Sequence, residues 1–435
     1  MTQTAQNNRL VSYDAAFARE IQALKFANTT SLVTALSGGP DSTALACLAE
    51  RYARSHGVEH QAIIVNHNLR SNSAIEAERV CKRMQDRSIT AEILTINDRA
   101  PTSGIQEWAR FQRFSALTDW ARQREAILLV AHHQADQAET VLMRLARGSG
   151  ISGLAAIRPV MYRETVPVVR PLLNWSVAAL RDVLNLLSCE YETDPSNQNC
   201  LFERVRVRNL IREGTACGYP TLAIAHRLGT AMAALSDHLN ATSLPIWRKA
   251  ASLGPTGHAV IDMNGLRDLP SPMWHHHVRH LIRHVGGHRY GVSSAALSRL
   301  RRRLTSDQNS TLGGCQFVRS NRLKKTAQYY VVREPGRNPS SLSVMAGDDV
   351  IFAGCWRVRT NLGGQLINAG MAPAQNVNLA ALPLPDPIAS QPFIVRRAIP
   401  VLHTLDGAVI YPQLKIGDCR AHSSKTDLSA QFLGL

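Results

Sequence analysis

The sequence predicts an α/β fold, with a doubly wound parallel sheet followed by a helical middle domain and a small, mainly β C-terminal domain. Apolar strand-like runs alternate with helical segments through the first half of the chain. A glycine turn follows the first of these runs directly. The alternation stops near Cys217, where Ala- and Leu-rich helix and then short strand-like runs take over. Strands joined at this spacing by helical crossovers are typical of parallel sheets covered by helices on both faces.

The elements follow from their apolar patterns. In the first half, strands are expected at residues 31–36, 61–65, 91–96 and 126–131, and helices near 42–55, 73–86, 106–124 and 135–147. Beyond these, helix is expected over 220–252 and 273–304, and short strands from about 311. The pattern predicts a catalytic domain over residues 1–216, a helical domain over 217–310 and a mainly β domain over 311–435.

The composition indicates a basic protein of two or three domains. Lys and Arg number 49 against 33 Asp and Glu, which gives a net charge of +16. The positive electrostatic field of such a protein favours a polyanionic partner. No apolar run approaches the ~20 residues of a membrane span, and the first residues lack the pattern of a secretory signal, so a cytoplasmic location is expected. The eight cysteines are dispersed without a CxxC pair, which argues against a disulfide framework or a zinc site.

The turn Ser37-Gly38-Gly39-Pro40-Asp41-Ser42 is the most informative stretch. Two adjacent glycines let the backbone approach a ligand closely, and amides at a helix N-terminus suit phosphate. Ser37 and Ser42 add hydroxyl donors. Asp41 would repel phosphates unless a cation bridges them, so the turn predicts Mg²⁺ with Asp41 as a ligand. The alternative is an ordinary capped strand-to-helix turn.

Two further histidines are expected near this turn. His67 and His132 each follow a strand, and ligands of doubly wound sheets bind at the carboxyl ends of the strands. Ser37, His67 and His132 should therefore share one crevice, although a histidine at a strand end is often only structural. His133 should point to the opposite face from His132, because adjacent side chains alternate along a strand.

Charged side chains on two predicted helices complete the candidate site. Arg110 and Arg113 lie on one helical stripe with Glu107 and Phe114; this stripe is either a salt-bridged surface or a row of cations facing ATP or RNA. Asp136 and Glu139, three residues apart, suit Mg²⁺ or a substrate amine better than zinc.

Basic residues also gather later in the chain. Arg204 and Arg208 form a basic face whether the segment is a strand or a helix, and this face is either solvated or in contact with RNA phosphate. A second cluster spans residues 299–303. The string Trp274-His275-His276-His277 is better explained by a helix face than by a metal site, since three consecutive residues diverge around a helix.

Seven strings, in this order, carry a family resemblance: SGGPDS, NHNLR, EWARFQRF, AHHQADQAET, RGSGISGL, RPLL and DPSN. The first resembles the signature of the PP-loop ATP pyrophosphatases, which have a Rossmann-like sheet. Together, over about residues 31–213, they resemble the tRNA(Ile)-lysidine synthases. Ala135 and Asn66 depart from that pattern, since Asp is common at both positions.

The resemblance implies a ligase that uses ATP. ATP adenylates O2 of the wobble cytosine in the CAU anticodon of tRNA(Ile) and releases pyrophosphate; the amine of free L-lysine then attacks C2 and expels AMP. On this view Asp41, Arg113, His132, Asp136 and Glu139 are the catalytic candidates. The nucleotide would meet the turn from Ser37 to Ser42, together with His67 and Arg110.

Two alternatives stay open at this point. One is a PP-loop tRNA thiolase, and the other is a non-catalytic RNA-binding protein. If the chain is a tRNA(Ile)-lysidine synthase, the region after residue 217 would bind the tRNA body, with Arg322, Lys324 and Lys325 among its cations. The sequence leaves the oligomeric state, monomer or homodimer, open.

Overall fold

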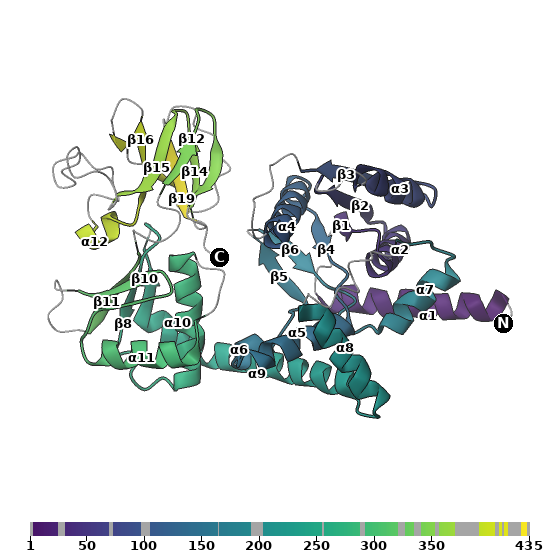
Figure 1. Cartoon of the computed structure of the whole chain (residues 1–435), viewed down its shortest axis with the longest axis horizontal. Coiled ribbons are helices and arrows are strands. Elements are labelled where there is room, and N and C mark those ends of the chain that lie inside the picture. Colours follow the sequence, from purple (N-terminus) through teal and green to yellow (C-terminus); the bar gives the residue numbers. More distant parts are fainter. Residues whose placement is uncertain are drawn as a thin grey trace. The chain divides into compact units, whose positions relative to one another are not determined.

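The protein forms two compact units, Met1–Ser236 and Asp237–Leu435. Each unit has its own hydrophobic core. The structure is a computed structural model (Figure 1) that describes residues 3–24, 31–68, 73–96, 105–163, 165–192, 203–254, 256–287, 292–320, 327–334, 341–352, 356–369, 391–404, 409–410, 413–415 and 428–432.

The first unit is built on a six-stranded sheet, in the order β3-β2-β1-β4-β6-β5. All neighbouring pairs are parallel except β5–β6. This confirms the doubly wound, mainly parallel sheet. The edge hairpin β5–β6 was not predicted, because each of its strands has only four residues. The bounds are β1 Ser31–Leu36, β2 Glu59–Asn66, β3 Ala91–Thr95, β4 Ile127–Leu129, β5 Val160–Arg163 and β6 Val166–Val169.

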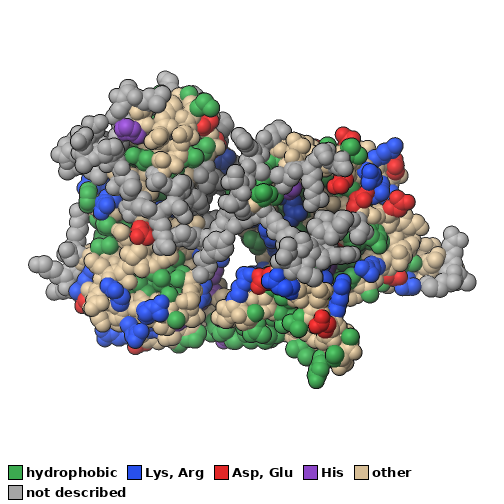
Figure 2. Space-filling model, in the orientation of Figure 1, with side chains coloured by type: hydrophobic (Ala, Val, Ile, Leu, Met, Phe, Trp, Pro, Cys, Tyr) green, Lys and Arg blue, Asp and Glu red, His purple; other side chains and the backbone are tan. Residues whose placement is uncertain are grey.

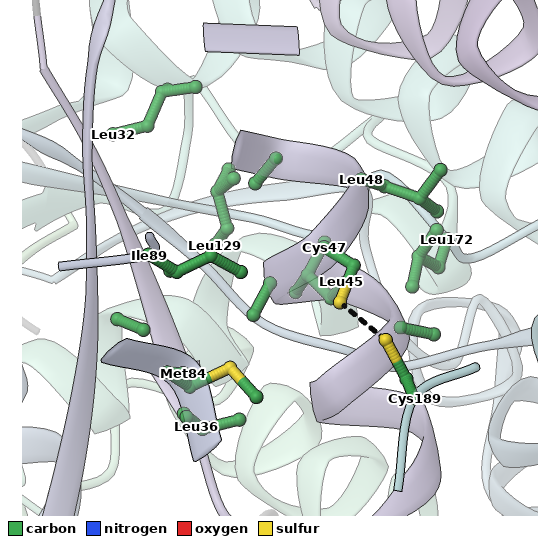
Figure 3. Close-up of a cluster of buried hydrophobic side chains, with 14 of the residues drawn as sticks. Leu32, Leu36, Leu45, Cys47, Leu48, Met84, Ile89, Leu129, Leu172 and Cys189 are labelled. Carbon is green, nitrogen blue, oxygen red and sulfur yellow. Dashed lines mark hydrogen bonds between the residues drawn. The ribbon is translucent and has the colours of Figure 1, made fainter. Parts of the chain in front are cut away.

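Helices cover both faces of this sheet. Leu32 and Leu36 of β1 face a core shared with α1 (Gln3–Ala23), α2 (Pro40–His56), α3 (Ser73–Gln85) and α7 (Val177–Leu186). Figure 3 shows the part of this core around Leu45 of α2. Val33, the neighbour of Leu32, faces the opposite core, where Phe114 of α4 (Ile105–Gln123) packs. This alternation of consecutive strand residues places the sheet between two helical layers.

Three more helices complete the first unit: α5 (Gln134–Ala146), α6 (Ile151–Leu154) and α8 (Glu203–Ala216). Val141 of α5 packs with Ile211 of α8 and with Ala225, at the start of α9 (Thr221–Ala250). The segment of Arg204 and Arg208 is therefore helical, which decides between the two alternatives left by the sequence. The DPSN string lies outside the described residues.

The second unit begins with a five-stranded antiparallel sheet, in the order β7-β8-β11-β10-β9. Helices α10 (Ser271–Gly286) and α11 (Ser294–Thr305) pack on it, with Trp274 fully buried. The division into domains at residues 216 and 310 stays a prediction, but β8 pairs across residue 310 with β11 in one sheet. The strands are β7 Ala251–Leu253, β8 Ala259–Asp262, β9 Ser310–Leu312, β10 Cys315–Arg319 and β11 Gln328–Arg333.

The C-terminal part is mainly β, as the sequence predicted. It has two four-stranded sheets, β12-β15-β16-β17 and β13-β14-β19-β18, with one short helix, α12 (Phe393–Arg396). Within the described ranges, no helix is both long and apolar enough to cross a membrane. The strands are β12 Ser341–Val344, β13 Asp349–Phe352, β14 Trp356–Thr360, β15 Gly364–Asn368, β16 Pro400–Thr404, β17 Val409–Ile410, β18 Gln413–Lys415 and β19 Leu428–Phe432.

Candidate active site

The glycine turn joins β1 to α2 at the carboxyl edge of the sheet. Gly38 has φ of +80°, and a Cβ added there would lie 2.6 Å from Cγ2 of Val80. A side chain at this position is therefore opposed both by the backbone conformation and by the packing of α3. The Ser42 hydroxyl donates to the Gly39 carbonyl at 3.1 Å and accepts from the Ser37 amide at 3.1 Å. These bonds brace the turn through its own residues.

Helix α2 begins in a way that suits an anion. Its N-cap is Gly39, which supplies no side-chain cap, and Pro40 follows at the first helical position. Proline has no amide hydrogen. The amide donors of the first turn are therefore those of Asp41 and Ser42, and no capping side chain binds them. Such amides, together with the helix dipole, favour a phosphate group. The turn therefore fits the nucleotide phosphates that the sequence predicted.

His133 connects this turn to the next helix. It is the N-cap of α5, where its Nδ1 accepts from the Ala135 amide at 3.2 Å while its own amide donates to Asp136 Oδ2 at 3.1 Å. Its Nε2 lies 3.4 Å from Asp41 Oδ2 and 3.5 Å from Asp136 Oδ2. Burial lowers the pKa of His133, but the hydrogen bond with Asp41 and the charge of Asp136 outweigh it, so the net pKa is raised.

The expected geometry of the two histidines needs a correction. Strand β4 ends at Leu129, so His132 and His133 are not consecutive residues of a strand, and the rule of opposite faces does not apply. The sequence therefore missed His133 as a neighbour of Asp41. The signal that could have found it was the capping box of His133 and Asp136, three residues apart ahead of an apolar helix.

His132 has a different environment. Its Nδ1 accepts from Arg170 Nε at 3.1 Å, because arginine has no lone pair to offer. Burial lowers the pKa of His132 to about 4; the charge of Asp136 opposes this shift, and the charge of Arg170 adds to it. His132 is thus neutral near pH 7, with its proton on Nε2, and it can donate a hydrogen bond from that atom.

Asp136 and Glu139 lie together on α5, but two arginines of α8 hold them. Glu139, only 1% exposed, accepts from Arg204 Nε at 2.8 Å and from Arg208 Nε at 2.7 Å. Asp136 Oδ1 lies 3.1 Å from Arg204 Nη2. Burial raises the pKa of Asp136, but the charges of His133 and Arg204 outweigh it and lower the pKa. The sequence had assigned these arginines to solvent or RNA and missed them as partners of the carboxylates.

The cationic stripe of α4 and His67 lie at the same edge. Desolvation and the charge of Arg204 lower the pKa of Arg110, whereas the charge of Asp136 opposes this shift. Burial, followed by the charge of Arg110, lowers the pKa of Arg113. Burial and the charge of Arg113 lower the pKa of His67. The Nδ1 atom of His67 is buried without a hydrogen-bond partner among the described residues.

The sequence-predicted site residues therefore fall into connected groups. Ser37, His67 and His132 all follow the carboxyl ends of parallel strands, as expected. Asp41 is joined through His133 to Asp136, and Arg113 adjoins His67. Within the described part of the chain, no group of three or more His, Cys, Asp or Glu side chains could hold a metal ion. A Mg²⁺ ion at Asp41 would thus depend on phosphate oxygens and water, which are its usual ligands beside one or two carboxylates.

This fold and site define a class of protein. The model of the PP-loop domain family matches residues 13–214, which contain the whole parallel sheet and every site residue described above. The chain is 33% identical over 291 residues to the tRNA(Ile)-lysidine synthase of Ruegeria pomeroyi, a match that covers 66% of this chain and 68% of that protein. The chain belongs to the tRNA(Ile)-lysidine synthase family.

Two further relatives carry the same name. The tRNA(Ile)-lysidine synthase of Hyphomonas neptunium is 33% identical over 299 residues, covering 66% of this chain and 79% of the relative. That of a Bradyrhizobium species is 40% identical over 223 residues, covering 51% of this chain and 60% of the relative.

Proposed function

We propose that this protein uses ATP to join lysine to C2 of the wobble cytidine in the CAU anticodon of tRNA(Ile), which gives lysidine. ATP adenylates the cytosine O2 and releases pyrophosphate; the side-chain amine of free lysine then attacks C2 and AMP leaves. The observation that carries the proposal is the link from the phosphate turn at Asp41, through His133, to Asp136. His133 contacts both Asp41, at the anion-binding turn, and Asp136, at the site proposed for a cationic substrate.

The nucleotide would bind at the turn. The uncapped start of α2 would receive its phosphates, and Asp41, whose side chain is 36% exposed, would hold Mg²⁺ together with them. When bound, Mg²⁺ would offset the charge that Asp41 brings beside the phosphates. Arg110 and Arg113 would supply positive charge to the α-phosphate as it is transferred.

The lysine would bind at Asp136 rather than at Glu139. Both oxygens of Glu139 already accept from Arg204 and Arg208, and its side chain is almost fully buried. Glu139 would thus position the two arginines, whose guanidinium groups could receive the α-carboxylate of lysine. Asp136, which is 17% exposed and binds Arg204 through one oxygen, would face the amine. The amine must lose a proton before it attacks, and the Asp136–His133 pair would accept it.

We assign the tRNA body to the region after residue 217. Figure 2 shows Lys and Arg side chains on the visible face in the region of α11. Not all of these cations are available to RNA: Arg301 donates to the carbonyls of Arg267 and Leu269 and so ties α11 to the loop before α10. Arg299 and Arg302 are exposed. Arg322, Lys324 and Lys325 lie outside the described residues.

One experiment tests the proposed reaction. The protein is incubated with ATP, labelled lysine and an unmodified tRNA(Ile) with a CAU anticodon, and the label on the tRNA, AMP and pyrophosphate are measured. Equal amounts of all three are expected. A methionine tRNA with the same anticodon is the matched control and should receive little label. Formation of ADP would contradict the proposal, and AMP and pyrophosphate formed with tRNA but without label on it would favour the thiolase alternative.

The assignment of the tRNA body has its own test. A chain that ends after Ser236 keeps the whole first unit, and it should bind ATP as the full chain does. Its tRNA affinity should fall by orders of magnitude, with a flatter dependence on salt, because each lost phosphate contact lowers the log–log slope by about 0.7–0.9. Unchanged tRNA affinity would refute this division of roles.

A further inference from the structure

Two buried thiols face each other behind the phosphate turn. Cys47 lies in the middle of α2, and Cys189 follows the end of α7. Their sulfur atoms are 3.3 Å apart, although the two residues are separated by 142 positions in the sequence (Figure 3). The residues are 5% and 7% exposed. A disulfide needs the sulfurs at about 2.05 Å, so the fold has already brought the pair to within a small movement of that bond.

A cavity lies beside this pair, with Cys47 itself and Leu187, two residues before Cys189, among its lining residues. It has a volume of about 500 Å³ and lies between α1, the second half of α2 and the loop after α3, with Cys47 in its wall. Most charges in the wall are paired: Arg51 binds Asp14 at 2.6 Å, and Arg54 binds Glu50 at 2.6 Å. The cavity is therefore large enough, and polar enough, to admit a small neutral polar oxidant such as hydrogen peroxide.

Arg87, which also lines the cavity, places positive charge beside the pair. Its guanidinium donates to the carbonyls of Leu187 and Ser188, the two residues before Cys189. The hydrogen bond from the Cys47 thiol lowers the pKa of Cys189 to about 7; burial opposes this and the charge of Arg87 adds to it. The same sulfur–sulfur contact raises the pKa of Cys47. One proton between the two sulfurs is thus the expected state near neutral pH.

We propose that Cys47 and Cys189 form a redox-sensitive dithiol site, which hydrogen peroxide oxidises to a disulfide through this cavity. Cys189 carries the negative charge and Cys47 keeps its proton. The Cys189 thiolate attacks one peroxide oxygen, and the O–O bond breaks to give a sulfenic acid and hydroxide. The Cys47 thiol then attacks the Cys189 sulfur, the S–O bond breaks, and water leaves. Hydroxide takes the proton lost at first ionisation, so two thiols and one peroxide give one disulfide and two waters.

The site is coupled to the turn by the chain itself. The amide of Glu192, three residues after Cys189, donates to the Gly38 carbonyl at 2.8 Å. Arg83, at the end of α3, binds the Glu192 carboxylate at 2.7 Å. A bridge at Cys189 would fasten this segment to α2, the helix that carries the turn. The dithiol is nevertheless distinct from the groups that the proposed reaction uses.

Peptide mapping of the full-length protein tests the proposal. Trypsin places Cys47 in peptide 26–51 and Cys189 in peptide 182–204, which also contains Cys200. A Cys200→Ser background therefore makes the assignment unique. After limited peroxide at pH 7 and alkylation of the remaining thiols, the two peptides should appear joined, two hydrogens lighter than the sum of their masses, and dithiothreitol should separate them. Thiolate content predicts oxidation about ten times faster than that of an ordinary buried thiol.

The chain offers a matched control. Cys81 is also buried, but its thiol donates to the Ala91 carbonyl rather than to a second cysteine. Cys47→Ala and Cys189→Ala should each abolish the joined peptide, and circular dichroism checks that each variant is folded. The proposal is overturned if the joined peptide does not form in the Cys200→Ser protein, or if Cys47 and Cys189 react no faster than Cys81.

Discussion

Replacing Glu139 by Gln should destabilise the first unit and not merely weaken a substrate contact. Glu139 is 1% exposed and holds Arg204 and Arg208 at 2.8 and 2.7 Å. An amide of the same shape keeps one acceptor oxygen but turns an NH₂ group toward an arginine donor. Breaking a fully buried ion pair costs roughly 3–5 kcal/mol. Both arginine side chains are 35% exposed, so water offsets part of this cost, and the expected loss is about 2 kcal/mol.

Urea unfolding of the wild type, Glu139→Gln, Arg208→Gln and the double variant measures this loss. The double variant should lose clearly less free energy of unfolding than the sum of the two single losses. Once Arg208 is replaced, the Glu139 carboxylate has lost one of its two cationic partners, so replacing Glu139 as well costs less. Ile211→Ala, on the same helix but outside the ion network, is the control and should show no such coupling with Glu139→Gln. If the single variant is as stable as the wild type and only its KM for lysine rises, Glu139 binds substrate directly and the reasoning fails.

Three further outcomes are expected. Gly38→Ala should lose nucleotide binding, measured by calorimetry, and about 1–2 kcal/mol of stability, because its φ of +80° disfavours a side chain; full ATP affinity would contradict the role of the turn. Asp136→Asn should still release pyrophosphate in the presence of tRNA but incorporate no labelled lysine, and failure to adenylate would show that the assigned role is wrong. The raised pKa of His133 means that its contribution to stability is complete below about pH 6.5 and is lost as pH rises through the folded value. Urea unfolding from pH 6 to 8 should show this loss in the wild type and not in His133→Gln, and an NMR midpoint for His133 below 6.5 would contradict it.

Much of the first unit could be predicted because its signals are local. The strands at 31–36 and 91–96 and the helices near 42–55 and 73–86 follow from runs and periods of apolar residues, and their order is sufficient to predict a parallel sheet. The Gly38-Gly39 turn indicates a phosphate site by itself, since glycine is the residue that a positive φ requires. The edge hairpin and α1 were missed, because short strands and a weakly amphipathic terminal helix leave little periodic signal.

The sequence by itself therefore determined strands β1 to β4 and helices α2 to α5 of the first unit, the family resemblance and the chemical types at the site. The tertiary structure decided which side chains distant in the sequence contact each other. Arg204 lies 65 residues from Glu139, and Cys189 lies 142 residues from Cys47, yet each pair is in contact. Such contacts depend on which helices pack against each other, and local patterns carry no information about that. For the same reason the assignment of Asp136, rather than Glu139, to the substrate amine came only from the structure, in which both oxygens of the 1% exposed Glu139 bind arginines of α8, whereas the 17% exposed Asp136 binds Arg204 through one oxygen.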